Sequence, residues 1–152
     1  MKTHGRGFTL IELIATVTII SILVGLAVPL ATNSIRRERE IELRQALREM
    51  RKAIDSYKET SDAGRIEVPP DTEGYPQTLD VMVDGVQLVG QAGKTYKALR
   101  KIPLDPMTNS ADWGMRSYQD EATARSWGGQ NVFDVYTKSS GTALDGTKYR
   151  DW

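Results

Sequence analysis

The feature that most constrains this chain is an apolar run over residues 8–30 in which Glu12 is the only ionisable side chain. As a helix at about 1.5 Å per residue, the run would reach about 35 Å, and the hydrocarbon core of a bilayer is about 30 Å thick. The run is therefore long enough to span a membrane. A carboxylate inside a spanning helix costs roughly 2.5–3.5 kcal/mol on insertion scales, so Glu12 requires a functional reason and a partner.

A short polar leader, residues 1–7, precedes the apolar run. In a secretory signal peptide the apolar region lies upstream of the cleavage site and is discarded with it. Cleavage between Gly7 and Phe8 would instead leave the apolar run on the mature protein and create a new amine at Phe8. This amine can pair with the Glu12 of a neighbouring copy, because paired charges cost less in an apolar medium than lone ones.

Residues 7–13, Gly-Phe-Thr-Leu-Ile-Glu-Leu, resemble the class III signal of type IV pilins and type II secretion pseudopilins. The resemblance implies that a prepilin peptidase cuts after Gly7 and methylates Phe8, and that Glu12 serves filament assembly. Pro29 falls where these proteins usually carry a helix-bending proline, and its missing N–H predicts a bend or a locally extended stretch between Gly25 and Leu30. The alternative is an ordinary single-pass anchor in which Glu12 reaches toward the headgroups.

Apolar residues beyond this run recur at steps of three and four, which predicts that the helix continues to about Glu59. They are Leu43, Ala46, Leu47, Met50, Ala53, Ile54 and Tyr57. We expect the charged residues on the other faces to be solvated, with pairing between subunits as the alternative. The chain then divides into a leader (1–7), a transmembrane and assembly helix (8–30), an amphipathic stalk (31–59) and a periplasmic domain (60–152).

Turn-forming residues follow Thr60 and predict a loop that leaves the stalk. A brief helix is expected next, and then three short strand candidates. The helix covers residues 78–83, and the strand candidates cover 86–89, 116–119 and 132–137. A small antiparallel sheet packed on the stalk would cover its apolar stripe. The expected fold class is α+β, with a long N-terminal helix packed against a small C-terminal antiparallel sheet domain, as in pilins.

The composition argues against an enzyme. The chain has no cysteine, and its one histidine, His4, lies in the leader. A mature chain without either residue cannot form a Ser-His-Asp triad, a Cys-His pair or a histidine-ligated zinc site. The formal net charge is zero, so nothing marks the chain as a nucleic-acid binder. We therefore expect a structural subunit.

Downstream motifs most resemble those of the major (G-type) pseudopilins. Residues 103–109 look like their Pro-x-Asp-Pro-x-x-Asn segment, residues 133–136 resemble their Phe-Asp-Leu-Tyr strand, and residues 74–76 resemble their Tyr-Pro-Thr segment. This resemblance implies a subunit of a periplasmic type II secretion filament that drives export of folded proteins across the outer membrane. The alternative is a type IV pilin subunit of a surface fibre for adhesion, motility or DNA uptake.

The resemblance also implies a location and partners. The chain would cross the bacterial inner membrane once, with its C-terminal domain in the periplasm, and would contact membrane lipid before assembly. Its protein partners would be the prepilin peptidase, an inner-membrane assembly platform, minor pseudopilins and further copies of itself in a homopolymer. No nucleic acid is expected among them.

Major pseudopilins commonly order their C-terminal region with calcium, which implies calcium as a cofactor here. Asp145 and Asp151 are the candidate ligands, in the loop formed by residues 138–152. Calcium takes about six to eight oxygen ligands, so backbone carbonyls near Lys138 would complete the shell. The alternative is that Asp145 supports an Asp-Gly turn and Asp151 is a solvated charge.

Overall fold

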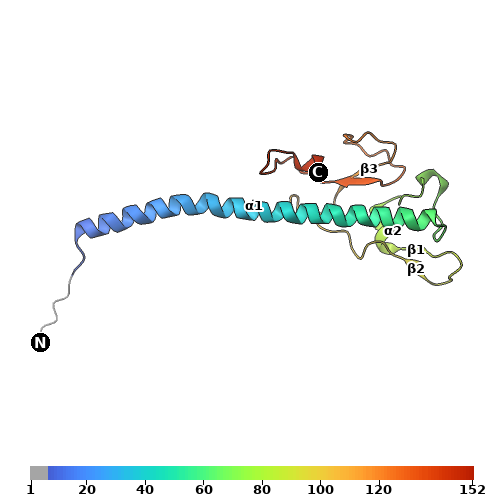
Figure 1. Cartoon of the computed structure of the whole chain (residues 1–152), viewed down its shortest axis with the longest axis horizontal. Helices are drawn as coiled ribbons and strands as arrows, with labels where there is room; N and C mark the ends of the chain where they lie inside the picture. Colours follow the sequence, from blue (N-terminus) through green and yellow to red (C-terminus); the bar gives the residue numbers. More distant parts are fainter. Residues whose placement is uncertain (1–6) are drawn as a thin grey trace, which may run out of the picture. The chain divides into compact units, whose positions relative to one another are not determined.

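The computed structural model describes residues 7–152, and for residues 26–31 it describes the backbone alone. The chain forms two compact units, Met1–Glu38 and Arg39–Trp152. Helix α1, Leu10–Asp62, is 53 residues long and contributes to both units (Figure 1). The remaining elements belong to the second unit, and the fold is the expected α+β combination of a long N-terminal helix with small antiparallel sheets.

In the first unit, every side chain described between Gly7 and Gly25 is exposed, the apolar ones included. An apolar surface of this extent marks a site that lipid or another protein chain covers. Among the residues that the structure describes, we find no helix with both the length and the apolar content required to cross a bilayer. The predicted span over residues 8–30 includes side chains outside the described residues, so it stays a prediction.

Helix α1 includes both Gly25 and Pro29. The Pro29 side chain lies outside the described residues, and the predicted bend at Gly25 and Pro29 therefore stays a prediction.

The apolar stripe predicted for the stalk forms one side of the core of the second unit. Leu43, Met50 and Ile54 are completely buried there. The other side of the core comes from residues distant in sequence, among them Trp113 and Val132. The Trp113 indole N–H donates to the Pro103 carbonyl at 2.8 Å, which satisfies its only polar atom. The prediction that the small domain covers this stripe is confirmed.

The elements that follow α1 are short. They are the 3₁₀ helix η1 (Pro70–Thr72), helix α2 (Leu79–Asp84), strands β1 (Val86–Gln87), β2 (Thr95–Tyr96), β3 (Gly114–Arg116) and β4 (Asp134–Tyr136), and the 3₁₀ helix η2 (Tyr149–Asp151). Strands β1 and β2 pair antiparallel, as do β3 and β4, so each sheet has two strands. Met115 lies opposite Val135 in the second sheet, and the Val135 side chain is completely buried in the core.

The predicted helix over residues 78–83 is confirmed as α2, and the strand predicted over residues 132–137 is confirmed as β4. The strand predicted over residues 116–119 is wrong beyond Arg116, where β3 ends. The Asp120 carboxylate accepts a hydrogen bond from the Ser117 N–H at 2.7 Å, and the Asp120 N–H donates to the Ser117 carbonyl at 3.0 Å. These bonds close a turn, which competes with strand formation.

Residues 103–109 form a turn that is tied to the sheet through Asp105. This carboxylate is completely buried and accepts hydrogen bonds from the Thr137 hydroxyl and from the Met107 N–H. The Asp105 N–H donates to the Ser110 carbonyl at 2.8 Å, and Asn109 takes the left-handed conformation that closes the turn. The segment over residues 103–109 therefore has a structural role, because the buried Asp105 carboxylate needs these hydrogen-bond donors.

Asp134 connects α1 to the second sheet. Its two carboxylate oxygens accept hydrogen bonds from Arg51 of α1, at 2.7 Å, and from Arg116 of β3, at 3.0 Å. Arg51 also donates to the carbonyl oxygens of Val135 and Trp152, at 3.2 and 2.6 Å. One arginine of the helix thus holds strand β4 and the C-terminal segment together.

We expect Asp134→Ala to destabilise the second unit by about 2 kcal/mol, because it leaves two partly buried arginines without their carboxylate. Asp112→Ala is the matched control, since its pair with Lys138 is exposed and worth about 0.5 kcal/mol. Urea unfolding of the full chain in detergent, followed by tryptophan fluorescence, measures both losses. Equal losses in the two variants would contradict the proposed role of Asp134.

Candidate processing and assembly site at the start of α1

Gly7 and Phe8 lie just before α1, in a stretch without regular secondary structure. Phe8 is 76% exposed, and among the described residues, the chain neighbour Phe8 aside, no atom lies within 4 Å of the position that a Gly7 side chain would occupy. The peptide bond between these two residues is thus open to an approaching protease. The structure places both predicted processing residues where cleavage is sterically possible.

Glu12 lies in the first turn of α1 and forms a capping box with Thr9. The Thr9 hydroxyl accepts a hydrogen bond from the Glu12 N–H at 3.3 Å, and the Glu12 carboxylate accepts one from the Thr9 N–H at 3.5 Å. A carboxylate at this end of a helix also interacts favourably with the helix dipole. Glu12 therefore has a role within its own chain besides the predicted role in assembly.

Both bonds of this capping box are long for hydrogen bonds to a backbone N–H. A bond between a carboxylate and an amine would be shorter and roughly twice as strong, because both partners are charged. The exposed Glu12 carboxylate can thus give up its hydrogen bond to the Thr9 N–H and bind a cationic group instead, at a small cost in free energy.

The role of Thr9 was missed in the sequence analysis, although the sequence contains its signal. A threonine followed three residues later by glutamate, just before an apolar run, is typical of a capping box at a helix N-terminus. Read this way, the sequence places the start of α1 at Leu10, where the structure has it.

Three hydroxyl side chains of α1 in the first unit donate their hydrogen bonds to the backbone of their own helix. Thr16, Thr18 and Ser21 each donate to a backbone carbonyl three or four residues earlier, at 2.8 to 2.9 Å. Their polar groups are satisfied within the helix, so they add little polar surface to it. This arrangement suits a helix that is surrounded by lipid or by other apolar helices.

Asp145 has its own hydrogen-bond partners in the C-terminal loop. Its carboxylate accepts bonds from the Thr147 N–H at 2.9 Å and from the Thr147 hydroxyl at 2.6 Å, and it lies 3.4 Å from the Arg44 guanidinium. These bonds, with a smaller contribution from Arg44, lower the pKa of the Asp145 carboxyl. Gly146 has a φ of 86°, as expected for the Asp-Gly turn of the alternative interpretation.

Asp151 belongs to η2 and is exposed. Together with Asp145 it offers oxygen ligands, which are the kind that calcium prefers. Within residues 7–152, however, the structure brings no three acidic, histidine or cysteine side chains together. The two aspartates suit calcium in kind, but backbone carbonyls and water would have to supply most of its ligands.

The C-terminal loop is held to α1 by contacts that the sequence did not predict. The Glu40 carboxylate accepts hydrogen bonds from the Leu144 N–H at 2.8 Å and from the Tyr149 hydroxyl at 2.9 Å. The Arg44 guanidinium lies 3.8 Å from the centre of the Trp152 ring, a cation–π contact. These contacts join residues more than a hundred positions apart, so no local sequence pattern signals them.

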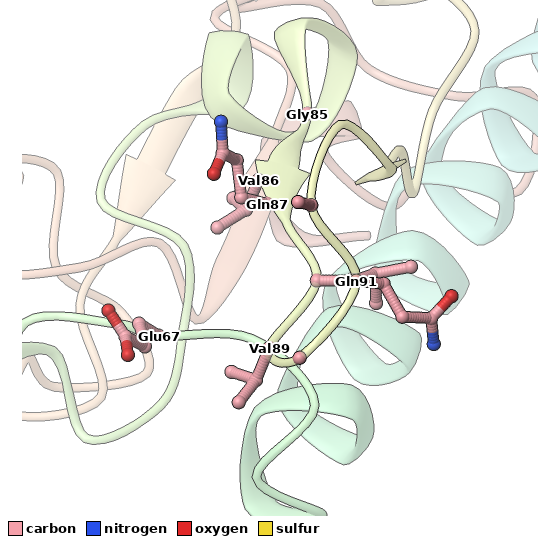
Figure 2. Close-up of a pocket in the computed structure, with 9 residues that line it drawn as sticks. Glu67, Gly85, Val86, Gln87, Val89 and Gln91 are labelled. Atoms are coloured by element: carbon pink, nitrogen blue, oxygen red, sulfur yellow. The ribbon is translucent and has the colours of Figure 1, made fainter.

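A pocket of about 780 Å³ lies at the turn between β1 and β2 (Figure 2). Residues 85–92 and Glu67 line it. In Figure 2 the Gln91 side chain points away from Glu67. Glu67 is the one titratable side chain in this lining, so the pocket offers no acid–base pair for catalysis.

Comparison with known proteins gave one match. Residues 2–28 match the family model described as the prokaryotic N-terminal methylation motif. The matched segment contains Gly7, Phe8 and Glu12, so the chain carries this motif at the site described above. No curated protein and no solved structure matches the chain.

Proposed function

We propose that this chain is a filament subunit of the pilin and pseudopilin type. It is made as a precursor, cleaved by a prepilin peptidase after Gly7, methylated at Phe8 and held in the bacterial inner membrane by α1 until it polymerises. The observation that carries the proposal is the N-terminal methylation motif over residues 2–28. The exposed bond between Gly7 and Phe8 supports it, because a peptidase needs access to that bond.

In the polymer, Glu12 pairs with the Phe8 amine of a neighbouring copy. Support comes from the long bonds that Glu12 makes to its own helix end and from the apolar surface around it. When apolar stems pack together, a lone carboxylate between them is costly and a paired one is much less so. Pairing therefore favours assembly over isolated chains.

Within this type we propose the major pseudopilin of a type II secretion filament, which acts in the periplasm on folded proteins to be exported. The motifs at residues 103–109 and 133–136 support this assignment, as does the absence of cysteine from the sequence. Minor pseudopilins and an inner-membrane assembly platform are then its partners. The second candidate is a type IV pilin. The neighbouring genes distinguish the two: a secretion operon indicates the pseudopilin, and the gene of a retraction motor indicates the pilin.

The mass of the chain isolated from membranes tests the processing step. We expect loss of residues 1–7 and the gain of one methyl group on Phe8, because the peptidase cuts after Gly7 and modifies the new terminus. Intact-mass spectrometry measures both changes. A chain of full length, or one shortened by the whole apolar run, would contradict the proposal.

A pair of variants separates the charge of Glu12 from its capping role. Glu12→Gln keeps a capping side chain but removes the charge, since glutamine also fits this position of a capping box. We expect it to be processed normally and to lower the polymer yield by at least about tenfold, through loss of a charge pair in apolar surroundings. Electron microscopy and sedimentation of cell-surface or periplasmic polymers measure the yield.

Thr9→Ala is the matched control, because it removes the capping hydroxyl and keeps the carboxylate. We expect polymer yield near that of the wild type, with cleavage of both variants verified by mass. If Thr9→Ala fails to polymerise while Glu12→Gln assembles normally, helix capping is the function of Glu12 and the proposed pairing is wrong.

We propose separately that the C-terminal loop takes up calcium through Asp145 and Asp151. Both carboxylates are exposed on one short loop, which supports the proposal. The ion would supply a cross-link across this loop, in place of the bonds that Asp145 makes to Thr147. The remaining oxygens would be backbone carbonyls and water.

Calcium is expected to raise the Tm of the full chain in detergent, because an ion bound only to the folded state stabilises it. Asp145→Ala should abolish this rise, and Asp80→Ala, a change at an exposed aspartate of α2, should leave it intact. Tryptophan fluorescence during heating, with calcium or with chelator, measures the difference. An equal Tm with calcium and with chelator would contradict calcium binding.

A further inference from the structure

A small pocket of the second unit gathers positive charge where β4 ends. Its volume is about 190 Å³, which suits a single charged group, since pockets that enclose a whole small molecule usually have about 300–1,000 Å³. The residues that line it, which we call the basic pocket, are Arg125, Tyr136, Thr137, Lys138, Ser139, Ser140 and Arg150. Three of these lining residues are cationic and none is acidic, so the basic pocket attracts an anion.

Arg150 of η2 has a buried polar atom without a partner. Its Nε is buried and makes no hydrogen bond, and among the side chains that the structure describes it is the one nitrogen or oxygen atom in this state. Buried polar atoms in native proteins almost always have a partner, and an exception points to a water molecule or an ion. A guanidinium stays charged at any ordinary pH, so an anion would satisfy both its N–H and its charge.

Arg125 adds a second guanidinium without a partner. Within the described part of the chain, neither Arg125 nor Arg150 makes an ion pair or a side-chain hydrogen bond. Exposed arginines such as Arg100 also occur elsewhere, each surrounded by water. In the basic pocket, however, two arginines line one small cavity, and their like charges repel unless an anion lies between them.

Lys138 is the third cation of the basic pocket, and its charge is already compensated. Its Nζ lies 2.6 Å from the carboxylate of Asp112. Two positive charges then remain without compensation, those of Arg125 and Arg150. The basic pocket therefore matches an anion that carries about two negative charges.

Hydroxyl groups of the basic pocket add further hydrogen-bond donors. The Ser139 hydroxyl oxygen accepts a bond from the Gly141 N–H at 3.2 Å, so its own proton is free to donate. Ser140 is exposed, and within the described residues its hydroxyl makes no hydrogen bond. The Thr137 hydroxyl donates to Asp105 and is already used. An anion with several oxygens is thus offered two serine hydroxyls besides the guanidinium groups.

We propose that the basic pocket binds a phosphate group, as inorganic phosphate or as a phosphate monoester on a larger molecule. A phosphate monoester carries about 1.5 to 2 negative charges at pH 7 and has three strong acceptor oxygens. Guanidinium groups bind such oxygens through paired N–H donors. A carboxylate has one charge and two oxygens, so it would leave one of the two arginines without compensation. This proposal is independent of the proposed function.

The test measures phosphate binding by the full chain in a non-ionic detergent. Titration calorimetry gives the Kd, and tryptophan fluorescence during heating gives the Tm with phosphate or with chloride at the same ionic strength. The buffers are freed of divalent cations, because calcium precipitates phosphate and Asp151 is next to Arg150 in the sequence. We expect phosphate to bind and to raise the Tm by a few degrees, since a ligand of the folded state stabilises it.

Arg150→Met removes the guanidinium and keeps an unbranched side chain. We expect phosphate binding to weaken at least about tenfold, because charge-assisted hydrogen bonds are lost. Without phosphate, the Tm of this variant should equal or exceed that of the wild type, because a buried polar atom without a partner is removed. A lower Tm together with unchanged phosphate affinity would show that Arg150 serves the fold alone and would overturn the proposal.

Arg125→Gln tests the same site at an exposed position, where the change leaves the core untouched. We expect a similar loss of phosphate affinity. Arg100→Gln is the matched control, since it makes the same change at an exposed arginine outside the basic pocket and should bind as the wild type does. Phosphate also stabilises proteins without a binding site, because it is excluded from their surface. An equal response to phosphate in Arg125→Gln and Arg100→Gln would therefore contradict the proposal.

Two further ligands define the occupant. Glycerol 3-phosphate that binds at least as tightly as inorganic phosphate identifies a monoester, and weaker binding identifies the free ion; both results support a phosphate site. Acetate that binds as tightly as phosphate would overturn it, because one charge and two oxygens would then suffice. These measurements need no polymer, so the phosphate site and the proposed function can fail separately.

Discussion

The structure depends on an apolar surface that one chain cannot cover. Between Phe8 and Gly25 every side chain of α1 is exposed, and the hydroxyls in this stretch bond to the backbone of their own helix. Water is a poor environment for such a surface, so lipid or other helices have to replace it. Membrane residence and polymerisation are two ways to meet the same constraint, and a chain of the proposed type uses both in turn.

In the second unit, α1 serves as the support on which a small domain is built. Both sheets have only two strands, and pairs of strands are marginal without further packing. The buried apolar stripe of α1 supplies that packing. Beside it, Glu40, Arg44 and Arg51 bind segments that are distant in sequence. The helix therefore has an apolar face for the core and, beside it, charged residues that bind the loops.

The sequence predicted the parts of the fold that follow local periodicity. The stripe from Leu43 to Tyr57, helix α2 and strand β4 were all readable from spacing and residue type. The turn at Ser117 was not, because the Asp120 side chain that closes it competes with a strand-like sequence. At the site, Gly7, Phe8 and Glu12 could be recognised from a local motif, whereas the contacts that hold the C-terminal loop join residues far apart in sequence.

Cleavage itself changes the electrostatics at the start of α1. In the precursor the nitrogen of Phe8 is a neutral amide, and the Glu12 carboxylate interacts with the partial positive charge at the helix N-terminus. After cleavage a full positive charge stands beside that same end, which is unfavourable for the helix unless a carboxylate lies near. The long bonds between Thr9 and Glu12 leave the carboxylate available to a charged amine. In the proposed mechanism, processing therefore creates the charge that assembly neutralises, and an uncleaved chain would lack the attraction that draws it into the polymer.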